Sequence, residues 1–86
     1  MKLADIGYGN FIARERVTAI CTPDAAPVKR LVSEAKELGK VVDVTCGKKT
    51  KSVILMDNGI VILCALPTEK AAERLDDETE GGKINE

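Results

Sequence analysis

The chain of 86 residues contains no histidine and no tryptophan, and only one phenylalanine and one tyrosine. Without histidine, a zinc site would depend on thiolates and carboxylates alone, and no recognisable ligand spacing is present. The three cysteines, Cys21, Cys46 and Cys64, are odd in number and form no CxxC pair, which argues against a disulfide framework. Tyr8 and Phe11 are too few to build the stacking platform of a single-strand or RNA binder. We therefore expect no metal and no cofactor.

The sequence also lacks a histidine that could act in catalysis and an apolar segment long enough to span a membrane. Cys46 is the only plausible nucleophile, since the nearby Lys48 and Lys49 favour a thiolate, but no histidine can activate it. No signal peptide precedes Asp5, and no apolar run approaches the ~18 residues that a membrane span needs. We expect a cytoplasmic protein that is not an enzyme, with no small-molecule substrate and no membrane partner.

The charged residues are unevenly distributed, although the formal net charge is only −1. Residues 1–68 hold ten Lys or Arg against seven Asp or Glu, whereas residues 69–86 hold three against seven. This predicts a mildly basic domain of residues 1–75 and an acidic, disordered tail of residues 76–86. So small a domain buries only about 60% of the surface that its unfolded chain exposes. Association into oligomers is the simplest way to bury more surface. It would also combine the positive potentials of the basic patches of several subunits.

Residues 43–66 combine the most apolar run of the chain with its tightest cluster of positive charge. Two strand-forming segments, residues 52–56 and 60–66, flank Asn58-Gly59, the strongest short signal for a β-hairpin. Neither segment alternates apolar with polar residues, so both faces of the hairpin are expected to be buried. We expect one face to form the core of the chain and the other to contact a neighbouring subunit.

The chain also predicts one main helix. Pro27 suits its first turn, Thr22 or Asp24 could cap it, and Gly39 suits its end. Its apolar stripe at helical spacing consists of Val28, Leu31, Val32, Ala35 and Leu38. The opposite face carries mixed charges, including those of Lys29 and Lys36, and is expected to be solvated rather than to bind directly.

Further strands are predicted over residues 1–6, 17–21 and 41–45, which are rich in β-branched or apolar residues. After Pro67, Thr68 could cap a short second helix. The fold class is therefore α+β, with a small and mainly antiparallel sheet, one main helix and a short C-terminal helix.

The candidate binding residues are all basic. Lys48, Lys49 and Lys51 place three like charges in four residues, which indicates contact with the phosphates of a polyanion. Arg14 and Arg16 would add to this surface if the fold brings them close, and in an extended chain both would point to the same side. The alternative is a solvated turn that protects a strand edge from aggregation. The chain would then be a structural or protein-binding oligomer without nucleic acid.

Several segments resemble the RemA family of extracellular matrix regulatory proteins. They are IGYGN at residues 6–10, TP at 22–23, APVKR at 26–30, DVTCGKKTK at 43–51 and ILMD at 54–57. These segments fall in the order and at the spacing of the family, and the match runs from about Ile6 to about Leu75.

The resemblance implies a transcriptional regulator that binds double-stranded DNA, activates biofilm-matrix genes and assembles into a homo-oligomeric ring. It implies a fold similar to LytTR-type DNA-binding domains, with residues 1–75 serving both DNA binding and oligomerisation. The DNA-contacting positions of the family fall on Arg16, Lys48 and Lys49, with Lys51 at the last basic position. Where the family has arginines in its GRRTR segment, this chain has lysines, which keep the charge but lack the guanidinium fork that reads guanine edges. We therefore expect recognition of the phosphate backbone and of DNA shape.

Overall fold

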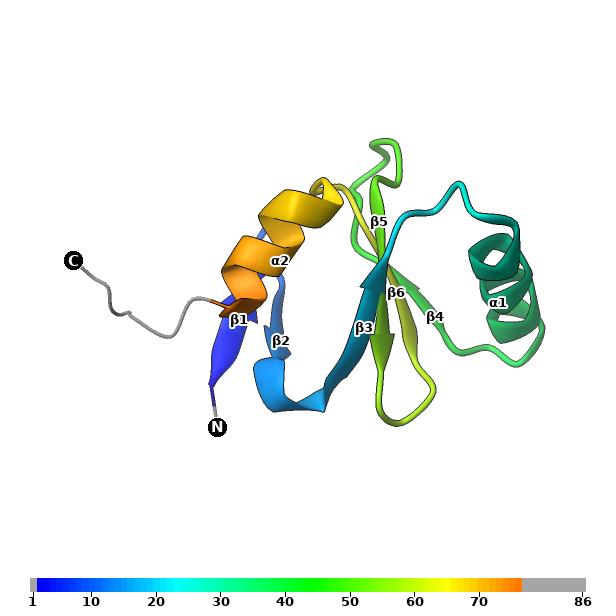
Figure 1. Ribbon diagram of the computed structural model, residues 1–86, viewed down its shortest axis with the longest axis horizontal. Helices are drawn as coiled ribbons and strands as arrows, with labels where there is room; N and C mark the ends of the chain where they lie inside the picture. The colour runs from blue at the N-terminus through cyan, green and yellow to red at the C-terminus, as the bar shows by residue number, and fades with distance from the viewer. Residues whose placement is uncertain (1, 77–86) are drawn as a thin grey trace.

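The computed structural model describes residues 2–76, which form two α-helices, six strands and one 3-10 turn (Figure 1). In chain order these are β1 (Leu3–Asp5), β2 (Phe11–Ala13), the 3-10 turn η1 (Arg14–Arg16), β3 (Val17–Cys21), α1 (Ala26–Glu37), β4 (Val41–Asp43), β5 (Ser52–Met56), β6 (Val61–Cys64) and α2 (Thr68–Asp76). The acidic tail expected over residues 76–86 lies, apart from Asp76, outside the described residues.

The described strands form a four-stranded sheet in the order β3-β5-β6-β4 and a separate antiparallel pair, β1-β2. β5 pairs antiparallel with both β3 and β6, whereas β4 pairs parallel with β6. The parallel direction of β4 follows from α1, because this helix returns the chain to the end of the sheet where β3 began. β4 therefore runs in the same direction as β3 and β6. The prediction of an α+β fold with a mainly antiparallel sheet is confirmed.

β5 and β6 form the hairpin that Asn58-Gly59 predicts. The N–H of Met56 donates to the carbonyl of Ile60 at 2.9 Å, and the side chain of Asn58 accepts a hydrogen bond from the N–H of Ile60 at 3.1 Å. Gly59 has a φ of 86°, a left-handed conformation that glycine adopts without steric cost. The turn that connects the two strands is therefore encoded locally.

Both faces of this hairpin are covered by other parts of the same chain. Figure 1 shows α1 on one side of the sheet and the β1-β2 pair with α2 on the other. One buried cluster consists of Val28, Ala35, Val53 and Val61, and the other consists of Ile6, Ile54, Ile62 and Cys64. Val53 and Ile54, adjacent in β5, belong to different clusters and are both fully buried. The expectation that one face of the hairpin contacts a neighbouring subunit is wrong, because the chain itself buries both.

The ends of α1 agree with the sequence pattern except at the cap. Pro27 lies in the first turn, and Gly39 follows the helix with a φ of 69°. Ala25 occupies the N-cap position, and no side chain accepts a hydrogen bond there. Neither Thr22 nor Asp24 has the expected capping role, because the cap falls one residue or more beyond them.

The buried strip of α1 is narrower than expected. Val28 and Ala35 are buried, and Val32 packs beside them. Leu31 and Leu38, by contrast, are 41% and 71% exposed. The residues of α1 that pack in the core therefore lie on one line at i, i+4 and i+7, whereas Leu31 lies at a surface hollow beside Leu55 and Met56.

The expected second helix is present as α2, and it packs against β1, β3 and β5. Thr68 is its first residue rather than a cap before it, and the N–H of Ala71 donates to the carbonyl of Pro67 at 2.9 Å. Ala71 is fully buried. The guanidinium of Arg74 donates to the carbonyl of Asp5 at 2.8 Å, which holds the last turns of α2 beside β1.

Candidate nucleic-acid interface

The three predicted lysines lie on the connection between β4 and β5, and we refer to residues 45–51 as the lysine turn. The N–H of Lys48 donates to the carbonyl of Thr45 at 3.0 Å, and Cys46 and Gly47 between them have φ values of 55° and 81°. Two consecutive residues with positive φ are typical of a type I′ turn. Gly47 adopts this conformation freely, whereas for Cys46 it costs about 1–2 kcal/mol.

Asp43, the last residue of β4, fixes the base of the lysine turn. Its Oδ1 accepts hydrogen bonds from the hydroxyl of Thr45 at 2.7 Å and from the N–H of Thr45 at 2.9 Å. These two hydrogen bonds, with that from the hydroxyl the stronger, lower the pKa of Asp43 below its usual value. At the other end, the N–H of Lys51 donates to the carbonyl of Cys64 at 2.9 Å. The backbone of the turn is thus held at both ends.

The side chains of Lys48, Lys49 and Lys51 are all exposed. None of them forms an ion pair with another residue in the described part of the chain. Three uncompensated positive charges on a well-anchored turn produce a local positive potential. This surface can attract the phosphates of a polyanion.

Arg14 and Arg16 lie at the opposite end of the sheet from the lysine turn. β3 begins directly after Arg16 and pairs with β5 so that Val17 faces Met56, whereas Lys51 precedes the start of β5. The six residue steps from Lys51 to Asp57 correspond to about 20 Å of extended chain. Figure 1 shows η1 at the bottom of the view and the β4–β5 connection at the top. The fold of a single chain does not bring the two arginines to the lysines.

Arg14 and Arg16 do not lie in extended chain, because both belong to the 3-10 turn η1. The expectation that an extended chain would point both side chains to the same side therefore does not apply. The guanidinium of Arg16 donates to Oδ2 of Asp57 at 3.3 Å, and its side chain is 65% exposed. An exposed ion pair of this kind contributes little to stability, so Arg16 remains accessible to a phosphate.

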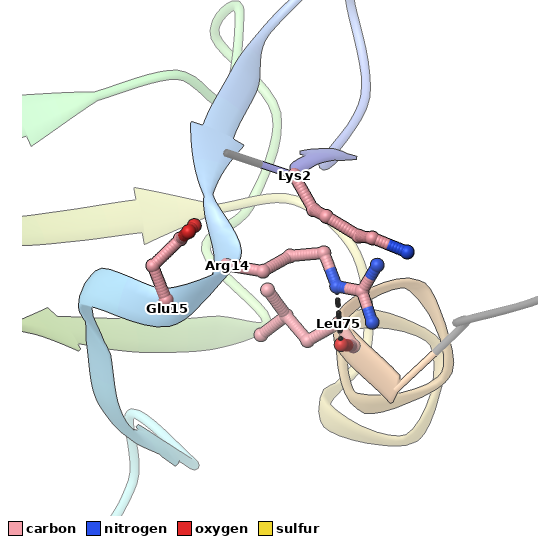
Figure 2. Close-up of a pocket in the computed structure, with 4 residues that line it drawn as sticks. All are labelled: Lys2, Arg14, Glu15 and Leu75. Carbon is pink, nitrogen blue, oxygen red and sulfur yellow. Dashed lines mark hydrogen bonds between the residues drawn. The ribbon is translucent and has the colours of Figure 1, made fainter.

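Arg14 has a different environment, at a shallow pocket of about 270 Å³ beside the end of α2. Figure 2 shows its guanidinium reaching across this pocket, where Nε donates to the carbonyl of Leu75 at 2.9 Å. A cation at the C-terminal end of a helix stabilises the exposed carbonyls there. Glu15 also lines the pocket, and a hydrogen bond from its own backbone N–H lowers its pKa. The geometry gives Arg14 a structural role, and its predicted contact with DNA stays a prediction.

Two residues that the sequence pattern assigned to a solvated face lie close to the lysine turn. Lys29 and Lys36 of α1 line a hollow of about 340 Å³ together with Thr50 of the lysine turn. The spacing of Lys29, Ser33 and Lys36 indicates one strip of the helix, but the sequence does not say that this strip lies next to residues 45–51. Only the tertiary structure brings them together.

Within residues 2–76, no helix is long and apolar enough to cross a bilayer. The same residues contain no group of three or more His, Cys, Asp or Glu side chains arranged to hold a metal ion.

The described residues thus form a small α+β domain with a central sheet covered on both faces and an exposed basic turn at one end. The chain is a member of the RemA-like family, described as "Extracellular matrix regulatory protein A-like", whose model matches residues 3–75. The resemblance found in the sequence is therefore confirmed.

Proteins named "Putative regulatory protein" from several bacteria are similar to this chain. One from Synechococcus elongatus is 53% identical over 73 residues, which cover 85% of this chain and 84% of the relative. One from Geobacillus kaustophilus is 46% identical over 85 residues, covering 95% of this chain and 98% of the relative. One from Clostridium botulinum is 42% identical over 86 residues, covering all of this chain and 94% of the relative. The chain thus belongs to a family of regulatory proteins.

Proposed function

We propose that the protein is a homo-oligomeric transcriptional regulator that binds double-stranded DNA through phosphate contacts. The observation that carries this proposal is the lysine turn, where Lys48, Lys49 and Lys51 are exposed and lack ion-pair partners in residues 2–76. Arg16 supplies a second, separate contact at the far end of β5. The protein acts as a binding module rather than as an enzyme, in the cytoplasm. The family description supports control of extracellular matrix, or biofilm, genes.

Recognition takes place through the DNA backbone and DNA shape. Lysine presents a compact point charge that attracts phosphate but does not form the bidentate contacts with guanine that arginine forms. The lysine turn therefore sets affinity and register, and the sequence dependence comes from how readily a duplex deforms to meet several turns at once.

The proposal requires several copies of the chain, because one copy has little excess charge. Residues 2–76 hold twelve Lys or Arg against ten Asp or Glu. An assembly adds the potentials of its lysine turns and strengthens the attraction for DNA. We assign this assembly a closed ring and the domain a fold of the LytTR type, as the family resemblance implies.

The subunit contacts proposed here involve exposed apolar residues instead of the buried hairpin. In the β1-β2 unit these are Leu3, Tyr8 and Phe11, and on α1 and β4 they are Leu31, Leu38 and Val42, all between 41% and 71% exposed. Figure 1 places these two groups of elements on opposite sides of the molecule. Joining unlike sides of successive copies gives a head-to-tail interface, which closes into a ring when the rotation permits.

Mobility shifts with a labelled duplex across a salt series test the proposal. The logarithm of the association constant should fall linearly with log[salt], by about 0.9 per phosphate neutralised. Lys48→Ala/Lys49→Ala should weaken binding at low salt by roughly tenfold or more and flatten this slope. The matched control is Arg30→Ala/Lys40→Ala, which removes the same charge from exposed positions away from the lysine turn and should retain most of the affinity.

Two outcomes would contradict the proposal. One is a salt-independent response of the wild-type protein. The other is equal loss of affinity in the two variants, which would mean that only total charge matters. A wild-type protein that assembles but binds no duplex would support the alternative of a structural or protein-binding oligomer.

A further inference from the structure

Two hollows adjoin the lysine turn and share a wall formed by Pro23 and Thr50. The first, of about 340 Å³, lies between α1 and the sheet, and we call it the α1 hollow. The second, of about 240 Å³, is lined by Lys49 and Lys51 and reaches the start of α2. Figure 1 shows the β3–α1 connection and the β4–β5 connection on the same side of the molecule, which agrees with this shared wall.

The α1 hollow is the more strongly basic of the two. Lys29 and Lys36 line it without any carboxylate, whereas Asp24 and Glu69 accompany the two lysines of the second hollow. Asp43 is already engaged by two hydrogen bonds from Thr45, which lower its pKa, and the charge of Lys36 helps to lower this pKa.

The polar groups of the α1 hollow form a line along the helix. Lys29, Ser33 and Lys36 occupy positions i, i+4 and i+7 of α1 and are all exposed. Seven residues of α-helix span about 10 Å, so the two lysines are spread along the hollow rather than gathered around one point. This arrangement suits a chain of repeated negative charges better than a single small anion.

We propose that the α1 hollow is an additional contact for the DNA backbone, so that a strand held by the lysine turn continues past Thr50 along α1. This inference rests on the proposed function and adds Lys29 and Lys36 to the DNA-binding surface. The surface then contains Lys29, Lys36, Lys49 and Lys51, and the exposed Lys48 belongs to the same turn as the last two. The peptide dipoles of α1 add positive potential at its N-terminal end, where the first turn contains no acidic residue to offset it.

Comparison of two double variants with equal charge tests this inference. Lys29→Ala/Lys36→Ala should weaken duplex binding at low salt by roughly tenfold or more and reduce the salt slope by about 1.8 per engaged subunit. Arg30→Ala/Lys40→Ala is the matched control, since Arg30 lies on the same helix but not at the hollow, and the side chain of Lys40 lies against Gly59. The control should retain both the affinity and the slope.

Ser33→Glu provides an independent variant that keeps every lysine. A carboxylate between Lys29 and Lys36 should repel phosphate and weaken binding, while an exposed helical position tolerates glutamate. Circular dichroism and sedimentation of each variant confirm that the fold and the assembly are intact.

The possible outcomes separate the two proposals. If wild-type protein binds the duplex and Lys29→Ala/Lys36→Ala binds as well as the control, the α1 hollow is not a DNA contact and the proposed function stands. If wild-type protein binds no duplex, both proposals fail. If Ser33→Glu and the lysine variant both lose affinity while the control does not, the inference is supported.

Discussion

Arg14 and Arg16 are two residues apart and carry the same charge, but their surroundings differ. Arg14 is half-buried and donates to the carbonyl of Leu75, 61 residues away in the chain, whereas Arg16 is exposed beside Asp57. The sequence alone did not separate them. The contact of Arg14 depends on where α2 packs, and residues 14–16 have no distinctive signal for the 3-10 turn that contains both arginines.

This difference predicts that the two arginines affect different properties. Arg14→Ala should lower the free energy of unfolding by about 1–2 kcal/mol, because α2 loses a hydrogen bond from a charged donor at its C-terminal end. Arg16→Ala should change it by less than about 0.5 kcal/mol, because it removes only an exposed ion pair. Urea unfolding followed by circular dichroism measures both. Equal losses in the two variants would mean that the contact with Leu75 does not stabilise α2.

The candidate lysines show what a sequence reveals about a surface. Lys48, Lys49 and Lys51 could be recognised because adjacent like charges are visible in the sequence and are rarely buried. Lys29 and Lys36 are ordinary charged residues of an amphipathic helix. Their position beside Thr50 follows from how α1 lies on the sheet, which no local pattern specifies.

Among the structural elements, those with local signals were predicted well. The β5–β6 hairpin and the end of α1 follow from Asn58-Gly59 and Gly39, where backbone conformation depends on the residue itself. The cap of α1 was predicted wrongly, because Thr22 and Asp24 are both plausible caps but the helix begins after Ala25. The parallel pairing of β4 was not foreseen, since it depends on the path of the chain across the whole sheet.

The stability of the lysine turn should depend on pH, because Asp43 holds the base of the turn. The folded-state pKa of Asp43 is lower than its usual value of 3.8, so its hydrogen bonds to Thr45 contribute their full stability above that value. The contribution is lost as the pH falls through the lower pKa of the folded protein. Asp43→Asn lacks the carboxylate, so wild-type protein should be more stable than this variant near pH 7. Because the variant does not titrate at this position, the difference in stability should shrink below about pH 4.

Thermal melts of the two proteins between about pH 7 and pH 2.5 measure this difference. Both proteins will lose some stability in acid through their other carboxylates, which is why the comparison uses the difference in melting temperature. A difference that stays constant down to the lowest pH would contradict the role of the Asp43 carboxylate.

At the scale of the whole molecule, the unbroken apolar runs of β5 and β6 correctly predict that both faces of the hairpin are buried. The prediction that a neighbouring subunit covers one of these faces is wrong. Hydropathy predicts that a face is buried and does not identify what covers it. Here α1 covers one face, and the β1-β2 pair with α2 covers the other. Surfaces for self-association must therefore be sought among the residues that the fold leaves exposed.

The proposed head-to-tail interface predicts complementation between two defective variants. Phe11 and Leu38 are 59% and 71% exposed and lie in the two apolar groups, so a charge at either position should block assembly without unfolding the chain. Phe11→Glu and Leu38→Glu should each sediment as monomers at concentrations where the wild-type protein is larger. An equimolar mixture should form dimers and nothing larger, because each pair of unlike variants retains one intact interface.

Sedimentation velocity of the separate and mixed proteins distinguishes the possible interfaces. In a symmetric interface each surface meets its own copy, so one of the variants would still form dimers alone and mixing would add nothing. That result would refute the head-to-tail arrangement.

The rigidity of β5 has a mechanical consequence for any complex with DNA. This strand is hydrogen-bonded along both edges and packed on both faces, and it connects the lysine turn to the residue that pairs with Arg16. It therefore holds the lysine turn and the exposed Arg16–Asp57 ion pair at a fixed separation. In the proposed complex, a duplex that contacts both the lysine turn and Arg16 would have to bend to match this separation, because β5 does not change its length.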